Sequence, residues 1–110
     1  MSALYAMKYQ GQAGTGLGTL YVGRNKIVGT DVGGGRYSGT YTDQNGRMKG
    51  AVLLSFPSGG VLVTGLQMQP NSSLPLSFDW PSNFGSGAPQ QIMVAGNPVG
   101  VAFEKIGDIP

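Results

Sequence analysis

Apolar and polar residues alternate along much of the chain, in short runs separated by turn-forming residues. In the clearest run, residues 74–80, Leu, Leu, Phe and Trp alternate with Pro, Ser and Asp. A period of two is typical of a half-buried strand, because successive side chains of a strand point to opposite faces. The pattern predicts strands over residues 3–10, 16–22, 26–31, 36–42, 47–56, 74–80, 91–95 and 99–106.

Two short segments carry turn signals. The dipeptide Asn45-Gly46 predicts a type I′ hairpin turn, since both central positions of that turn need positive φ. Asp31 ends a predicted strand just before three consecutive glycines, and we expect its carboxylate to accept hydrogen bonds from turn amides. Asp31, Asn45 and Gly46 are therefore predicted to be structural turn residues.

Two segments lack clean alternation. Residues 61–68 are consistent either with a further strand or with a loop that packs inward. Residues 81–90 are rich in Pro, Gly, Ser and Asn, which predicts a loop.

Eight short strands joined by close turns predict an all-β fold: an antiparallel, up-and-down barrel whose closure removes exposed sheet edges. A chain of 110 residues has room for one hydrophobic core, so we expect a single domain over residues 1–110. A sandwich of two sheets fits the same periodicity.

Glycine is over-represented, with 20 residues where an average usage of roughly 7% predicts about eight. Gly18, Gly29 and Gly39 stand inside strand patterns, where glycine permits a sharp bend or close packing. The glycine-rich segment 14–18 lacks the spacing of the phosphate-binding fingerprints, and no helix is predicted after it. We therefore interpret the glycines as architectural.

The chain contains no Cys and no His, so the usual thiol nucleophile, general base and metal ligands are missing. No constellation of Asp, Tyr, Lys or Ser replaces them, which favours a protein that is not an enzyme and holds no metal or cofactor. A net charge of +2 on scattered basic residues predicts no nucleic-acid partner. With no basic leader and no apolar run of about 18 residues, we expect a cytoplasmic protein without a membrane partner.

Aromatic residues and methionine gather on one face of the predicted strands. An eight-stranded barrel is just wide enough to be filled by side chains or to hold one small ligand. A pocket lined in this way would receive an apolar molecule, whereas a filled core would leave no room for one. The residues expected to line such a cavity are Tyr5, Met7, Tyr37, Tyr41, Phe78, Trp80 and Phe103, with Leu17, Ile27 and Val101 also inside.

Residues 47–56 depart from alternation, because positions 51–56 read Ala-Val-Leu-Leu-Ser-Phe. Only one face of a barrel wall looks inward. Burial of the other face against a second copy of the chain explains the run, and each Leu or Phe so covered contributes about 1.5–3 kcal/mol. Alternatively, residues 57–73 fold back over this strand. The residues expected at a homodimer interface are Val52, Leu53, Leu54 and Phe56.

Four motifs follow one another in the first half of the chain. They are G-x-G-x-L-x-V from Gly16, N-K-I-V-G-x-D ending at Asp31, R-Y-x-G-x-Y from Arg36 and G-R-M-x-G-x-V from Gly46. Over about residues 3–56 the chain resembles the GrlR-like family, named after a negative regulator of a bacterial type III secretion system. The resemblance implies an eight-stranded, lipocalin-like barrel with an internal apolar cavity, which dimerises through hydrophobic outer faces. The founding member holds a transcriptional activator through an acidic cluster; this chain has no run of acidic residues, so that contact is not carried over.

We therefore expect a non-enzymatic binding protein: a homodimeric protein-interaction module of GrlR-like type, whose protein partner is unknown. The alternative is a carrier or sensor of a small apolar ligand inside the barrel. An open cavity lined by Tyr and Met would favour the carrier, and a filled barrel the interaction module. Two carboxylates converging in a cleft would instead indicate an enzyme.

Overall fold

The structure, a computed structural model, describes residues 2–110, which form ten strands and no helix. Accordingly, no helix in this range has the length and apolar character needed to cross a membrane. The strands are β1 (Ser2–Gly11), β2 (Gly14–Gly23), β3 (Lys26–Asp31), β4 (Arg36–Gln44), β5 (Arg47–Phe56), β6 (Gly60–Val61), β7 (Gln67–Met68), β8 (Ser72–Pro81), β9 (Gln90–Val94) and β10 (Asn97–Asp108).

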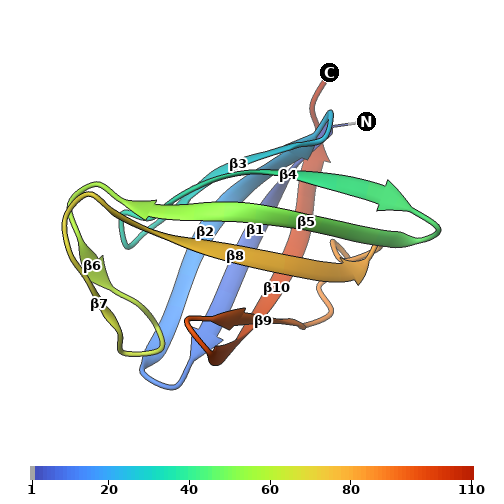
Figure 1. Cartoon of the computed structure of the whole chain (residues 1–110). Coiled ribbons are helices and arrows are strands. Elements are labelled where there is room, and N and C mark those ends of the chain that lie inside the picture. Colours follow the sequence, from blue (N-terminus) through green and yellow to red (C-terminus); the bar gives the residue numbers. More distant parts are fainter. Residues whose placement is uncertain (1) are drawn as a thin grey trace.

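Eight strands form one antiparallel sheet in the order β8-β5-β4-β3-β2-β1-β10-β9, which curls into a nearly closed barrel (Figure 1). Because β1 pairs with β10, the open seam lies between β8 and β9. The indole Nε1 of Trp80 donates a hydrogen bond across this seam to the carbonyl oxygen of Gln91, at 3.3 Å. The predicted all-β, single-domain, up-and-down barrel is confirmed, and the sandwich is excluded.

The hairpin turns follow the local sequence. Asn45 and Gly46 have φ of 54° and 75°, as the predicted type I′ turn requires. Arg24 and Asn25 between β2 and β3 have φ of 53° and 64°. These tight turns place consecutive strands next to one another, so the order of the sheet follows the order of the chain.

Glycines on the inner face of the barrel lie opposite large side chains of neighbouring strands. Gly18 is paired with Met7, and Gly50 with Phe78. A Cβ on Gly50 would lie 2.7 Å from Cζ of Phe78, too close for two carbon atoms. Only glycine leaves room for the ring, which confirms the architectural interpretation of the strand glycines.

Residues 57–71 add no strand to the barrel wall. Within them β6 and β7 form a separate short hairpin, the capping hairpin (residues 60–68), at one end of the barrel (Figure 1). Leu62 of this hairpin is buried in the core. The amide of Ala13 in the β1–β2 turn donates to the carbonyl of Val63 at 2.6 Å. Of the two expectations for residues 61–68, the inward-packing loop is correct and the barrel strand is wrong.

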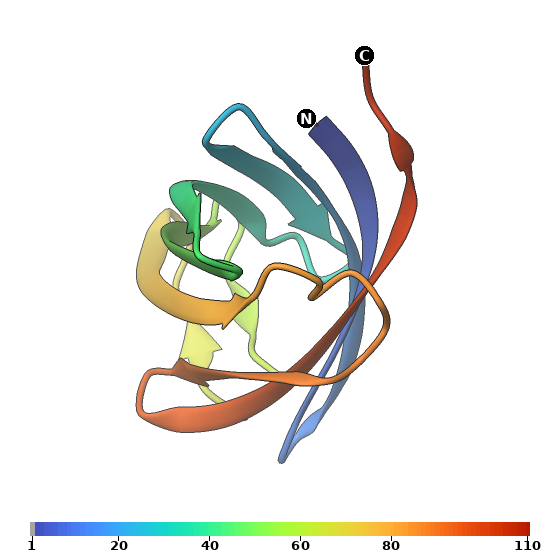
Figure 2. The same ribbon diagram turned by 90° about the vertical axis from the view of Figure 1, so that its right-hand side faces the viewer.

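The opposite end of the barrel is covered by the loop between β8 and β9, residues 82–89. Figure 2 shows this loop crossing in front of the curled sheet. Phe84 from the loop is buried, and its ring lies 5.0 Å from that of Tyr5 and 5.4 Å from that of Phe103, between centroids. The ring therefore acts as a plug, and the interior of the barrel is bounded by a side chain at this end and by a hairpin at the other.

Candidate functional site

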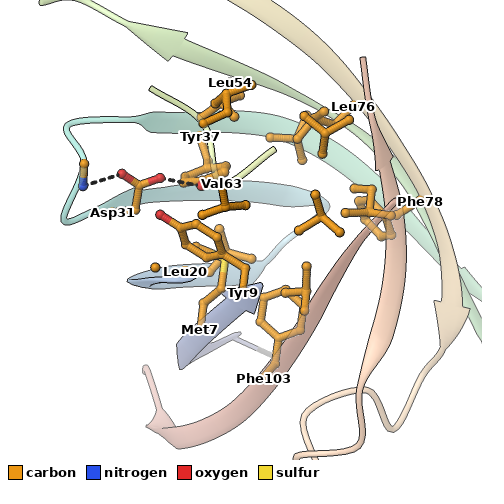
Figure 3. A pocket seen from close by; sticks show the side chains of 18 of the residues that line it. Met7, Tyr9, Leu20, Asp31, Tyr37, Leu54, Val63, Leu76, Phe78 and Phe103 are labelled. Carbon is orange, nitrogen blue, oxygen red and sulfur yellow. Dashed lines mark hydrogen bonds between the residues drawn. The ribbon is translucent and has the colours of Figure 1, made fainter. Parts of the chain in front are cut away.

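A cavity of about 190 Å³ lies inside the barrel, between the sheet and the capping hairpin (Figure 3). Its wall is mainly apolar. Of the residues expected to line a cavity, five do so: Met7, Tyr37, Phe78, Trp80 and Phe103, and Ile27 and Val101 join them. The interior of the barrel therefore contains a cavity as well as a packed core.

Three residues expected inside are placed differently. Tyr5 and Tyr41 are partly buried and pack against the core, but they do not line the cavity. Leu17 points outward and is 52% exposed. Its neighbours Gly16 and Gly18 take the inner positions of β2, so the alternation of that strand puts Leu17 on the outer face with Thr19.

The expected homodimer interface is wrong for three of its four residues. Val52, Leu54 and Phe56 are buried and line the cavity. Only Leu53 lies on the outer face, with 48% exposure. Strand β5 alternates after all: its run of apolar residues combines large inward side chains with Ala51 and Leu53 outside. The exposure of Leu53 also shows that residues 57–73 do not fold over the outer face of β5.

One charged group lies on the cavity wall among the described residues. Asp31, at the end of β3, is the only charged side chain among the described residues that line the cavity. Its Oδ1 accepts hydrogen bonds from the amides of Gly33 and Gly35, both at 2.9 Å, as predicted for a turn residue. Its Oδ2 accepts the hydroxyl of Tyr37 at 2.6 Å (Figure 3). Asp31 therefore joins the β3–β4 turn to the cavity, a second role that its position in the sequence did not indicate.

Two tyrosines flank this carboxylate. In Figure 3 the hydroxyl of Tyr9, from β1, points towards Asp31 close to the hydrogen bond between Asp31 and Tyr37. Burial, followed by the negative charge of Asp31, raises the pKa of Tyr9 to about 12. Burial and the hydrogen bond to Asp31 also raise the pKa of Tyr37. Both phenols are therefore neutral at physiological pH, and Asp31 alone gives the cluster its charge.

Several lining residues were not anticipated from the sequence. Tyr9 shares a face with Met7 in the alternation of residues 3–10, so periodicity was a sufficient signal for it. Leu62, Val63 and Phe84 come from segments outside the barrel strands. Nothing in the local pattern of those segments indicates which side chain turns inward.

The wall combines a mainly apolar surface with one carboxylate. Among residues 2–110, no group of three or more Asp, Glu, His or Cys side chains could hold a metal ion. A second carboxylate does not accompany Asp31 among the described lining residues. Compared with protein-family models and with curated proteins, the chain matches none.

Proposed function

We propose that the protein binds a small apolar molecule inside its barrel, as a carrier or sensor and without catalysis. The observation that supports this is the hollow interior, about 190 Å³ with an apolar wall. An apolar cavity of about 150 Å³ is enough to bind benzene, and pockets for drug-sized ligands run from about 300 Å³ upward. The ligand is therefore small: one ring with a short substituent, or a short alkyl chain.

Calorimetric titration with ethylbenzene tests this proposal. We expect saturable binding of one molecule per chain. The variant Val63→Phe adds a ring from the capping hairpin to the cavity and abolishes binding. The matched control Val28→Phe makes the same change on the outer face of β3, where Val28 is exposed, and keeps binding. Absence of any heat of binding from the native chain, with no small-molecule adduct in native mass spectra of protein purified from its own host, would refute the proposal.

We also propose a homodimer, on a different surface from the one expected within β5. One row of outward side chains crosses six paired strands in register, and five of the six are apolar. In order along the row these are Leu4, Tyr21, Val28, Ser38, Leu53 and Pro75. A two-fold axis near the middle of this row would lay its central residues, Val28, Ser38 and Leu53, against those of a second copy, which is the geometry of an isologous dimer.

The resemblance of residues 3–56 to the GrlR-like family supports a dimer, because it implies dimerisation through outer faces and a role in protein interaction. A cytoplasmic location belongs to this proposal, since a chain with no Cys gains nothing from an oxidising compartment. Light scattering coupled to size exclusion tests the dimer. The native chain and Met93→Glu, a charge placed on exposed β9 outside the row, run as dimers, whereas Leu53→Glu runs as a monomer. A monomeric native chain would overturn the dimer and leave ligand binding intact.

A further inference from the structure

The charge of Asp31 has no counterion in the described part of the chain. The three ion pairs there join Arg47 and Lys49 to Asp79, and Lys105 to Asp108. Asp31 instead stands on an apolar wall, half-buried, beside two phenol rings. Three hydrogen bonds compensate part of the cost of placing this carboxylate on an apolar wall, and a partner of opposite charge would compensate more of it.

The hydrogen bonds of Asp31 leave part of the carboxylate available. An ionised carboxylate offers about four acceptor positions on its two oxygens. Two amides donate to Oδ1 and the hydroxyl of Tyr37 donates to Oδ2. The hydroxyl of Tyr9 also points towards this carboxylate (Figure 3), so a donor from a ligand would share the remaining acceptor position with Tyr9. Oδ2 is therefore the oxygen with capacity for another donor.

We propose that the ligand carries a protonated amine, which binds Asp31 Oδ2 while its apolar part occupies the cavity. This inference rests on the proposed function and specifies the ligand class for the same site. An ammonium group supplies both a hydrogen-bond donor for Oδ2 and a positive charge to pair with the negative charge of Asp31. A hydroxyl supplies only the donor.

The surroundings of Asp31 favour an organic cation in particular. Tyr9 and Tyr37 approach the carboxylate through their hydroxyl groups (Figure 3), and a hydroxyl oxygen can accept a hydrogen bond from an ammonium group. A metal ion would need further anionic ligands, and Asp31 is the only charged lining residue described. Because Asp31 is half-buried, at the end of the barrel near the β3–β4 turn, the ammonium group keeps part of its hydration.

Three probes of matched shape separate this inference from apolar binding alone: 2-phenylethylamine, 2-phenylethanol and ethylbenzene, titrated calorimetrically at pH 7. The amine is protonated at this pH. We expect the amine to bind at least about tenfold more tightly than the alcohol or the hydrocarbon, as a hydrogen bond to a charged group is worth about 1.5–3 kcal/mol. In Asp31→Asn, which keeps the shape of the side chain and removes its charge, the amine falls to the affinity of the alcohol. In that variant ethylbenzene binds as before.

The control Asp79→Asn removes a carboxylate from the outer surface and leaves the preference for the amine unchanged. Equal binding of the amine and the alcohol by the native chain would overturn the inference but leave the proposed function standing. Binding of none of the three would overturn both. The comparison among ligands on the native chain decides the question even if Asp31→Asn fails to fold, which circular dichroism would reveal.

Discussion

The ring of Tyr9 lies directly over Gly16 of the adjacent strand, so closely that a Cβ on Gly16 would overlap it. The same relationship recurs elsewhere in the barrel, where Met7 lies opposite Gly18, Leu20 opposite Gly29 and Phe78 opposite Gly50. In this way the glycines determine the shape of the cavity: they leave room for rings against the wall. The rings then line a narrow space instead of filling it.

A methyl group at one of these glycines should destabilise the fold. A Cβ on Gly39 would overlap the backbone carbonyl oxygen of Ala51 on β5, and backbone cannot move aside as a side chain can. We expect Gly39→Ala to lower the free energy of unfolding by about 1–3 kcal/mol or more. Gly107→Ala is the matched control, since nothing lies within 4 Å of its Cβ, and it should be neutral. Urea unfolding followed by circular dichroism measures both; equal stability of the two variants would contradict the argument.

Truncation of two consecutive leucines of β5 should lower stability by very different amounts. Leu54 is 4% exposed and lines the cavity, whereas Leu53 lies on the outer face. We expect Leu54→Ala to cost about 2–5 kcal/mol of stability, and Leu53→Ala less than about 1 kcal/mol in the monomer. Unfolding should be compared at low protein concentration, so that the proposed dimer does not contribute. Similar losses for both variants would mean that β5 does not alternate as described.

The ring of Phe84, which closes the loop end of the barrel, should contribute as much to stability as a buried residue of a strand. Phe84 is 3% exposed and packs against Tyr5, Trp80 and Phe103. We expect Phe84→Ala to cost about 3–5 kcal/mol and to shift the fluorescence of Trp80, the single tryptophan, to longer wavelength as water reaches it. Asn83→Ala, an exposed neighbour in the same loop, should change neither property. An unshifted spectrum in Phe84→Ala would mean that the loop does not seal this end.

The sequence was sufficient to predict the wall of the barrel, and the reason is local. Alternation and the turn at Asn45-Gly46 act over a few residues, so strand ranges and hairpins followed from pattern alone. Which face of each strand points inward was harder to predict. Where small residues occupy the inner positions, as around Leu17, apolar character no longer marks the inside. The apolar run in β5 led to a wrong prediction of an interface for the converse reason: apolar residues on the outer face hid a regular alternation.

The ends of the barrel and the polar cluster could not be predicted in this way. Leu62 and Phe84 turn inward because segments distant in the sequence meet them, such as Ala13 for the capping hairpin and Tyr5 for the loop. The turn role of Asp31 was local and was predicted. Its contact with Tyr37 depends on the pairing of β3 with β4 and on the curl of the sheet, which no local pattern encodes.

Alkaline pH should destabilise the protein through the tyrosines beside Asp31. The pKa of Tyr9 is raised from 10.0 to about 12 in the folded chain, first by burial and then by the charge of Asp31. Between these two values the folded chain holds a proton that the unfolded chain has released, so unfolding becomes more favourable as the pH rises. This contribution to stability is complete below pH 10 and is lost as the pH rises through about 12. Tyr37, whose pKa is also raised, acts in the same direction.

Urea unfolding by circular dichroism at pH 9, 10.5 and 11.5 follows this loss. Tyr9→Phe and Tyr37→Phe each remove one titrating phenol, so the stability of each variant should decline less steeply with pH than that of the native chain. Tyr37→Phe also removes the hydroxyl that Asp31 accepts, and should lower stability by about 1.5–3 kcal/mol at pH 7. If the stability of both variants declined with pH as steeply as that of the native chain, other groups would cause the loss of stability at alkaline pH. The carboxylate and the two phenols would then not interact as one cluster.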